Sequence, residues 1–390
     1  MALSADLLVW KRRIHARLLS ESDASRLSRL PREALSEQVA QTASRLLSSE
    51  NSVLTGRQRE GLVQAVLHEL VGLGPLEPLL EDETVTEIMV NGPARIYVEQ
   101  GGRLTLTDIC FDDEAHLRRI IERILAPLGR RADESSPIAD GRLADGSRIN
   151  IILPPLSVRG PILTIRKFAR TPLLVSDLIR LGTLTVQASE FLRGCVEKRL
   201  NILVSGGTGS GKTTTLNALS SFIPSGERIV TIEDAAELQL QQAHVVTLES
   251  RPANLEGRGE VTIRQLVKNA LRMRPDRLLL GEVRGGEALD LLQALNTGHD
   301  GSLSTIHANS PRDALSRLET LTLMAGADLP LRAVREQVAS AVQLVVQQQR
   351  FPNGSRRVTH LSEVIGIADG SLVVTDLFRW EPHLEALVEV

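Results

Sequence analysis

The sequence predicts an α/β protein in which a parallel sheet flanked by helices follows an α+β module and a helical N-terminal bundle. Three observations predict this fold class. Apolar strand-like runs alternate with helical patterns after about residue 200, as in a parallel sheet covered by helices. Short strands separated by turn residues fill the preceding stretch, and helical periodicity dominates the beginning of the chain. We expect a bundle at 1–71, an α+β domain at 72–168, a linker at 169–172 and a last domain at 173–390.

The composition is typical of a globular protein and excludes several classes. Of the 390 residues, 42% are hydrophobic and 2% aromatic, and the formal net charge is −3. This near balance of charge and the scarcity of aromatic rings argue against a nucleic-acid partner. Cys110 and Cys195 are too few for a disulfide framework or a cysteine-rich zinc site. There is no signal-peptide pattern and no run of about 18 apolar residues, so we expect a cytoplasmic protein whose membrane contact is peripheral and made through partners.

Three amphipathic helices are expected before residue 72. Their apolar faces are formed by Leu7, Trp10, Ile14 and Leu18, by Leu35, Val39, Ala43 and Leu46, and by Leu62, Val66 and Leu70 after a Thr55 cap. This spacing predicts a small antiparallel bundle. The first helix carries Lys11, Arg12, Arg13 and Arg17 on its other face. A basic helix that lies on an acidic membrane surface or on a partner therefore stays open as an alternative.

The stretch 72–168 changes to short strands and turns. Strands are expected at 86–90, 95–99, 103–107, 141–143, 147–153 and 163–168. Asp112 is the expected cap of one helix, whose apolar face is Leu117, Ile120, Ile121 and Ile124. Such a mixture of strands and one helix predicts an α+β domain.

Residues 201–216 read NILVSGGTGSGKTTTL and combine a strand, a glycine-rich loop and a helix start. In that context they fill the phosphate-loop pattern G-x-x-x-x-G-K-[ST]. Glycines let backbone N–H groups curl around phosphate oxygens, and the helix directs its unpaired N–H groups at the same anion. Lys212 is expected to reach the β- and γ-phosphates, and the Thr213 hydroxyl to bind Mg²⁺. The predicted nucleoside triphosphate site comprises Gly206, Gly207, Thr208, Gly209, Ser210, Gly211, Lys212, Thr213 and Thr214.

Acidic residues follow two later strands. The strand 228–233 ends in Glu233 and Asp234, with Glu237 a few positions on, and the apolar run 278–280 leads through Gly281 into Glu282. Ligands gather at the carboxyl ends of strands in open α/β sheets. These acids are therefore candidates for holding Mg²⁺ or polarising water. A cap or turn role is the alternative for Asp234, and a structural role stays open for Glu233.

Two histidines flank one expected strand, 301–306. His299 precedes the strand and His307 follows it, before a helix start at Ser310-Pro311. In a domain with a phosphate loop they suggest a γ-phosphate sensor or a relay to a neighbouring subunit, although histidines are ordinarily structural. The pair lacks the close spacing and the third ligand of a zinc site, so no zinc is expected.

Arginines gather in the α+β domain ahead of the nucleotide site. Arg142, Arg148, Arg159 and Arg166 stand in or beside expected strands. A single arginine there is ordinarily a solvated surface residue. Four in a short span suggest phosphate contacts, because the guanidinium fork suits phosphoryl oxygens.

Together these motifs resemble the secretion ATPases of types II and IV, and most closely the CpaF-like branch that powers tight-adherence (Flp-type) pili. The resemblance rests on the phosphate loop and on TIEDAAEL at 231–238, RPDRLLLGEVRGGEA at 274–288 and TGHDGSLSTIHANS at 297–310. It extends to GLGPLEPLL at 72–80, DESSPIADGRLADGSRIN at 133–150 and SRRVTH at 355–360. It thus spans about residue 70 to the C-terminus, whereas the residues before it match only in being helical.

The resemblance implies an ATPase that uses ATP and Mg²⁺ and assembles as a cytoplasmic homo-hexamer peripheral to the inner membrane. It implies a PAS-like α+β domain and a RecA-like ATPase domain that hold ATP between them, and an inner-membrane platform protein as partner. Closure of the two domains across the linker would turn ATP binding and hydrolysis into motion. Having only two cysteines, the chain lacks the four-cysteine zinc module of other pilus-assembly ATPases.

The resemblance also assigns roles by position. By this resemblance, Glu233, Glu237 and Glu282 would manage Mg²⁺ and the attacking water. His299 and His307 would form the histidine box, and Arg148 and Arg166 would approach the phosphates. Arg142 and Arg159 fit this pattern less well.

We therefore expect a motor that assembles, or also retracts, a tight-adherence or type IV-like pilus or a type II secretion filament. A nucleic-acid-translocating ATPase of a conjugation-type secretion system stays open as an alternative, which predicts DNA-stimulated and salt-sensitive activity. A non-enzymatic ATP-binding scaffold fits poorly, because the phosphate loop and the acids are both present. No substrate pocket of a small-molecule kinase can be identified from the sequence.

Overall fold

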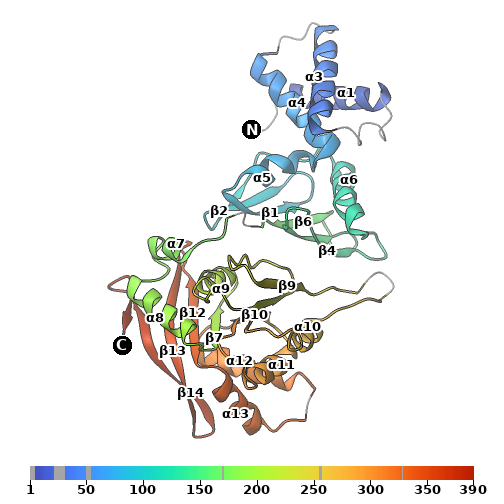
Figure 1. The fold of residues 1–390 in the computed structure, drawn as a ribbon. Coiled ribbons are helices and arrows are strands. Elements are labelled where there is room, and N and C mark those ends of the chain that lie inside the picture. Colours follow the sequence, from blue (N-terminus) through green and yellow to red (C-terminus); the bar gives the residue numbers. More distant parts are fainter. Residues whose placement is uncertain (1–4, 22–30, 50–53, 169–170, 254–256, 327) are drawn as a thin grey trace. The chain divides into compact units, whose positions relative to one another are not determined.

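The computed structural model describes residues 5–21, 31–49, 54–168, 171–253, 257–326 and 328–390 (Figure 1). The chain forms two compact units, Met1–Phe168 and Ala169–Val390. Both contain helices and sheets, so the fold class is α/β as the sequence predicts. Within the described ranges, no helix has the length and apolar character needed to cross a membrane.

In the described part of residues 1–71, the first unit begins with three packed helices, as the periodicity predicts. They are α1 (Ala5–Glu21), α3 (Arg32–Ser49) and α4 (Gly56–Val71). Apolar side chains of all three, including Ile14, Val39 and Leu62, are buried in one cluster. Thr55 caps α4 as expected, because its side chain accepts a hydrogen bond from Gln58 N while Gln58 Oε1 accepts one from Thr55 N.

Lys11 departs from the expected basic face of α1. Its side chain is buried, with Nζ 2.8 Å from Glu69 Oε1 on α4, and Glu69 Oε2 lies 2.9 Å from His116 Nε2. Burial raises the pKa of Glu69, but the hydrogen bond with His116 and the charge of Lys11 outweigh burial and lower this pKa to about 2. The cluster fastens the helices to the α+β region and leaves a smaller basic face than expected.

The rest of the first unit is a six-stranded antiparallel sheet, in the spatial order β3-β2-β1-β6-β5-β4. Its strands are β1 (Val85–Asn91), β2 (Ile96–Gln100), β3 (Arg103–Leu106), β4 (Ile138–Arg142), β5 (Arg148–Ile152) and β6 (Ile162–Arg166). The helical segments are η1 (Gly74–Leu76), α5 (Glu77–Glu81), α6 (Glu114–Leu125) and η2 (Ala126–Leu128). The apolar face of α6 joins the core of this sheet, which confirms the α+β arrangement. The PAS-like description stays a prediction.

The cap of α6 is Asp113, so the expectation of Asp112 is wrong by one residue. The Asp113 carboxylate accepts a hydrogen bond from His116 N at 2.7 Å. Asp112 Oδ2 instead lies 3.1 Å from Arg12 Nε on α1. Asp112, which the local pattern favoured as the helix cap, therefore forms an ion pair with another helix instead.

The second unit is built on a nine-stranded mixed sheet, in the order β15-β14-β13-β12-β7-β11-β10-β8-β9. The strands are β7 (Ile202–Gly206), β8 (Ile229–Glu233), β9 (Val245–Glu249), β10 (Arg277–Val283), β11 (Leu303–His307), β12 (Leu344–Arg350), β13 (Arg356–Ala368), β14 (Ser371–Glu381) and β15 (Ala386–Glu389). Strands β7 to β12 are parallel, but β13 to β15 are antiparallel. The parallel expectation fails at this edge because the turn at 351–355 is too short for a crossover connection.

Helices cover both faces of this sheet (Figure 1). On one face, α7 (Val175–Arg180), α8 (Val186–Glu197) and α9 (Lys212–Ser220) share a core with the strands. On the other, α10 (Ile263–Ala270), α11 (Glu287–Leu295), α12 (Pro311–Leu323) and α13 (Leu331–Ala341) do so. Because both faces are covered, β7 and β8 are buried at every residue. The acidic residues of β8 and β10, Glu233 and Glu282, lie at or near the carboxyl ends of their strands.

Candidate nucleotide-binding site

The phosphate-loop motif forms the expected strand, loop and helix. Strand β7 ends at Gly206, and α9 begins at Lys212 with Gly211 as its N-cap. Gly209 and Gly211 have φ angles of 68° and 96°, in the left-handed region that glycine adopts at low cost. A Cβ at Gly206 would lie 2.4 Å from Gln348 O. The backbone curl thus depends on glycine at these positions.

The loop presents donors suited to an anion. Lys212 Nζ donates a hydrogen bond to Gly207 O at 3.1 Å, which draws the ammonium group across the loop. Thr213 and Thr214 are half-buried in the first turn of α9, where helical N–H groups lack intrahelical partners. Thr208 is exposed. Ammonium, N–H and hydroxyl groups at one helix N-terminus fit a nucleoside triphosphate with its divalent cation.

Glu233 ends β8 as a buried carboxyl group that is 3% exposed. Its Oε2 accepts hydrogen bonds from Glu237 N at 2.9 Å and Leu238 N at 3.1 Å. Burial raises the pKa of Glu233 to about 7, although the two N–H groups oppose that shift and Glu237 adds to it. A Cβ at Gly281 would lie 2.8 Å from Glu233 Cγ, so this glycine makes room for the acid. Near neutral pH, Glu233 can therefore either hold or accept a proton.

Glu282 lies near the end of β10, beside the end of β8. Its Oε2 is 2.6 Å from Arg284 Nη2, and Arg284 Nη1 is 3.5 Å from Asp234 Oδ2. The hydrogen bond that Arg284 donates to Glu282 raises the pKa of Arg284, and the charge of Glu237 acts in the same direction. The acids of both motifs thus form one electrostatic cluster around Arg284, a residue that the sequence analysis did not single out.

His307 ends β11, the strand between β7 and β10. In the sheet register it is the partner of Gly206, the first loop residue. Burial lowers the pKa of His307, and the nearby positive charge of Lys212 lowers it further, whereas Glu282 opposes this shift. The lowered pKa favours the neutral imidazole of His307 beside the phosphate loop, and its role as a phosphate sensor stays a prediction.

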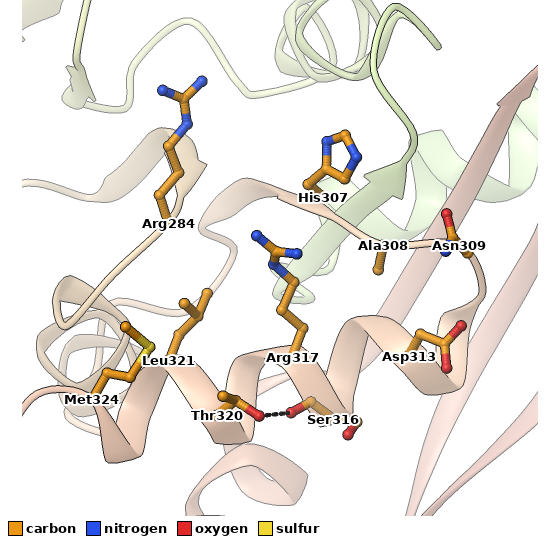
Figure 2. Close-up of a pocket in the computed structure, with 10 residues that line it drawn as sticks. All are labelled: Arg284, His307, Ala308, Asn309, Asp313, Ser316, Arg317, Thr320, Leu321 and Met324. Atoms are coloured by element: carbon orange, nitrogen blue, oxygen red, sulfur yellow. Dashed lines mark hydrogen bonds between the residues drawn. The ribbon is translucent and has the colours of Figure 1, made fainter.

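An open pocket of about 560 Å³ continues from His307 along α12 (Figure 2). Its charged lining is Arg284, Asp313 and Arg317, with Met324 at its far end. Figure 2 shows the Arg317 guanidinium directed from α12 toward the His307 side of the pocket. Sequence reasoning missed Arg317. Arg317 lies about two turns into the helix that starts at Ser310-Pro311, directly after His307, and this position could have indicated that it lies near the site.

His299 lies at the other end of β11, and the structure does not bring it to the phosphate loop. Its Nδ1 is 3.2 Å from Ala294 O, and its backbone O accepts a hydrogen bond from Ser302 Oγ at 2.7 Å. At about 3.3 Å per residue, the length of β11 separates the two histidines by roughly 15 Å. A catalytic role for His299 within its own subunit has no support from this geometry, and its action on a neighbouring subunit stays a prediction.

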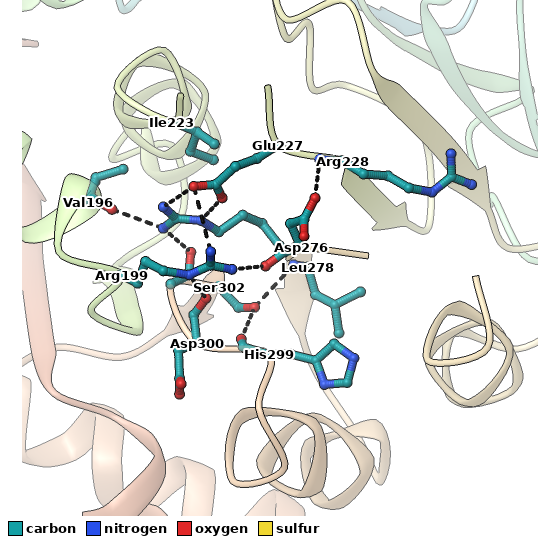
Figure 3. Close-up of polar contacts among 12 residues, drawn as sticks. Val196, Arg199, Ile223, Glu227, Arg228, Asp276, Leu278, His299, Asp300 and Ser302 are labelled. Atoms are coloured by element: carbon teal, nitrogen blue, oxygen red, sulfur yellow. Dashed lines mark hydrogen bonds and ion pairs between the residues drawn. The ribbon is translucent and has the colours of Figure 1, made fainter. Parts of the chain in front are cut away.

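His299 belongs to a polar cluster at the amino ends of the strands (Figure 3). Its centre is Arg277, which is 0% exposed. Its Nε lies 2.5 Å from Glu227 Oε2, and its Nη1 donates to Val196 O at 2.9 Å and Gly301 O at 3.0 Å. These contacts neutralise the guanidinium charge and satisfy its hydrogen-bond donors. They indicate a structural role for the amino-terminal ends of these strands.

The candidate arginines of the first unit form a row on its sheet. Arg142, Arg148 and Arg166 are successive register partners on β4, β5 and β6. Arg166 Nε is 3.9 Å from Glu87 Oε1 and its side chain is 55% exposed. Arg159 is exposed in the loop before β6 and lies outside the row. Their action on phosphates stays a prediction.

Comparison with known proteins places the chain in a family. The model of the family "Type II/IV secretion system protein" matches residues 69–358. A protein of Mycobacterium tuberculosis that is named for conjugal transfer is 42% identical over 308 residues, covering 77% of this chain and 87% of that protein. Conjugal transfer protein TrbB of Rhizobium radiobacter is 37% identical over 291 residues, covering 74% and 86%. Type IV secretion system protein PtlH of Bordetella pertussis is 38% identical over 322 residues, covering 73% and 91%.

Solved structures share the fold at lower identity. The pilus retraction motor PilT with bound ADP has a TM-score of 0.52 at 18% identity, covering 80% of this chain and 82% of that one. The Legionella pneumophila ATPase DotB has a TM-score of 0.52 at 19% identity, covering 80% and 81%. The family model covers most of the chain, and several relatives above 30% identity match along most of their own length. The chain therefore belongs to the family of type II/IV secretion system proteins.

Proposed function

We propose that this chain is a Mg²⁺-dependent ATPase that works as a motor in a secretion or pilus machine. One observation carries the proposal. Strands β7, β11, β10 and β8 are neighbours in the sheet, and they deliver the phosphate loop, His307, Glu282 and Glu233 to the same edge. An anion cradle, a metal carboxylate and a proton acceptor side by side are what phosphoryl transfer to water requires.

The side chains divide the work by their chemistry. Lys212, which already leans across the loop, turns from Gly207 O to the β- and γ-phosphates when the nucleotide enters. Thr213 and Glu282 would hold the cation, and release of Glu282 from Arg284 would free that guanidinium for developing phosphate charge. Mg²⁺, when bound, would neutralise phosphate charge that develops during the transfer.

Glu233 is the proposed proton acceptor for the attacking water, with Glu237 tuning its charge. Its pKa of about 7 matches the pH at which a general base is most effective. Neutral His307 donates a hydrogen bond to the γ-phosphate and distinguishes ATP from ADP. Arg148 and Arg166 are the proposed phosphate contacts from the first unit, and closure of that unit would convert binding into motion.

The motor role is the finer part of the proposal. We propose a homo-hexamer on the cytoplasmic face of the inner membrane, docked on a platform protein, that assembles or retracts a tight-adherence or type IV-like pilus. The resemblance of the motifs to the CpaF-like branch supports this, as does the fold shared with a pilus retraction motor. A conjugation-type translocating ATPase is the second candidate, because two of the relatives are named for conjugal transfer.

One experiment tests both candidates. Steady-state ATP hydrolysis by the purified chain is measured with and without Mg²⁺, single-stranded DNA and anionic liposomes, with light scattering in parallel. Slow Mg²⁺-dependent turnover by a hexamer that ignores DNA is the expected result. Strong stimulation by DNA would favour the translocase, and absence of turnover with nucleotide binding intact would point to a partner-activated motor or a scaffold.

A further inference from the structure

The hairpin of β12 and β13 packs against the phosphate loop. β12 is the parallel neighbour of β7, and Gln348 is the register partner of Gly206. β13 returns antiparallel, with Arg356 opposite Arg350. Two residues of this hairpin, Gln348 and Arg356, make direct contacts with the loop and its helix.

The first contact fixes a peptide of the loop. Arg356 Nε donates a hydrogen bond to Gly209 O at 2.8 Å. In a trans peptide the C=O and the following N–H point in opposite directions. The bond from Arg356 to the Gly209 carbonyl therefore leaves the Ser210 N–H on the opposite side of the peptide, where it donates a hydrogen bond to Gly207 O at 3.3 Å. Lys212 Nζ donates to the same carbonyl, so the Ser210 N–H faces the side of the loop on which the ammonium group lies.

The second contact fixes the first turn of the helix. Thr215 Oγ1 donates a hydrogen bond to Gln348 Oε1 at 2.7 Å, and both side chains are buried. At Gly211 a Cβ would lie 3.1 Å from Gln348 Nε2 and 3.3 Å from Arg356 Cδ. The hairpin is thus in close contact with the loop at both of its left-handed glycines.

The backbone of Arg356 is itself fixed. Its carbonyl accepts a hydrogen bond from Thr183 Oγ1 at 2.9 Å, and Val358 N donates to Thr183 O at 2.9 Å. The turn before it is closed by the hydrogen bond from Phe351 N to Ser355 O at 2.8 Å. The guanidinium therefore extends from a hydrogen-bonded strand to the glycine-rich loop.

We propose that Arg356, assisted by Gln348, is a positioning residue that presets the phosphate loop for nucleotide. The proposal rests on the proposed function, because it assumes that the loop binds a nucleoside triphosphate. A glycine-rich loop has many backbone conformations, and ordering it on binding costs conformational entropy. An arginine that holds one peptide in place removes part of that cost before the nucleotide arrives.

The test compares two neighbouring arginines on β13. Arg357 donates to Leu181 O at 2.8 Å, and its guanidinium lies 5.5 Å from the Trp380 ring centroid. It shares the strand and the charge of Arg356 but contacts α7 and β14 instead of the loop. Arg357→Gln is therefore the matched control for Arg356→Gln, and Arg356→Lys retains charge and a donor. Dissociation of N-methylanthraniloyl-ADP and the kcat and KM for ATP are measured on the full chain.

Arg356→Gln is expected to raise the Kd for the labelled ADP about tenfold, because binding must then supply the entropy cost of ordering about one loop residue. KM should rise similarly and kcat change less than threefold. Arg356→Lys should recover part of the affinity, and Arg357→Gln should bind like the wild type even where it melts earlier. Equal losses for the two glutamine variants, or a Kd within twofold of wild type for Arg356→Gln, would overturn the positioning role. A wild-type chain that binds no nucleotide would instead overturn the proposed function.

Discussion

Replacing Glu233 by glutamine should stabilise the second unit at high pH and leave its stability unchanged at low pH. The Glu233 pKa rises from its ordinary value of 4.5 to about 7 in the folded chain. The folded state therefore binds more protons than the unfolded state between about pH 4.5 and 7, and stability falls as the pH rises through that window. At about 1.4 kcal/mol per pKa unit, the carboxyl costs up to about 3 kcal/mol above pH 8.

Glutamine keeps the local hydrogen bonds, so their loss does not add to the measured difference in stability. Glu233 Oε2 accepts from both Glu237 N and Leu238 N, at 2.9 and 3.1 Å, while Oε1 is 3.4 Å from Leu238 N. An amide oxygen in the place of Oε2 preserves the two shorter bonds. Because the side chain is 3% exposed, solvent screening does not reduce the expected effect appreciably.

The assay can report the second unit alone. The chain has two tryptophans, Trp10 in α1 of the first unit and Trp380 in β14 of the second. In a Trp10→Phe background, urea titrations followed by fluorescence are compared for Glu233 and Glu233→Gln between pH 5 and 8.5. The difference in unfolding free energy should grow from near zero to about 3 kcal/mol in favour of glutamine. A difference that does not change with pH would refute the raised pKa and, with it, the general-base role.

Three more substitutions separate binding, chemistry and structure. Lys212→Ala should weaken ATP binding about a hundredfold, since it removes charged hydrogen bonds to phosphates; fluorescent-nucleotide titration measures this, and unchanged affinity would contradict the phosphate-loop assignment. Glu282→Gln should keep ATP affinity within about threefold but lower kcat about a hundredfold or more, and normal turnover would remove its assignment as the Mg²⁺ carboxylate. Arg277→Met leaves Glu227 without its closest partner and should cost about 3–5 kcal/mol in denaturant titrations. Arg199→Met removes an exposed side chain that lies 3.8 Å from the same Glu227 and donates a hydrogen bond to Asp276 O at 2.7 Å, and it should cost less than about 2 kcal/mol.

The core of the site could be predicted from sequence because each part is local. The glycine spacing of 206–211 encodes its own turn, and apolar runs that end in Glu233 or Glu282 identify strand ends without knowledge of the fold. Parallel strands then bring such ends to a common edge. A general rule about sheets was thus enough to expect the acids beside the loop.

The missing parts depend on contacts between distant segments. Arg356 and Gly209 are 147 positions apart, and Gln348 and Thr215 are 133 apart. Their contact follows from the insertion of β12 beside β7, and nothing in the local periodicity specifies strand order. Lys11 illustrates the same limit, because its burial depends on Glu69, 58 positions away.

The two ends of the sheet show why buried charge alone does not identify a reactive group. At the amino ends, Arg277 is fully buried, but a carboxylate and two carbonyl oxygens surround it, so neither its charge nor its donors are available. At the carboxyl ends, Glu233 is equally buried, but only two neutral N–H groups hold it, and they are too weak to offset its desolvation. Burial with a matched counter-charge gives a rigid anchor, whereas burial without one gives a carboxyl that can exchange a proton near neutral pH. Burial without a counter-charge occurs at the carboxyl ends of the strands, where the phosphate loop lies. For that reason we assign the chemistry to Glu233 and the support of the sheet to Arg277.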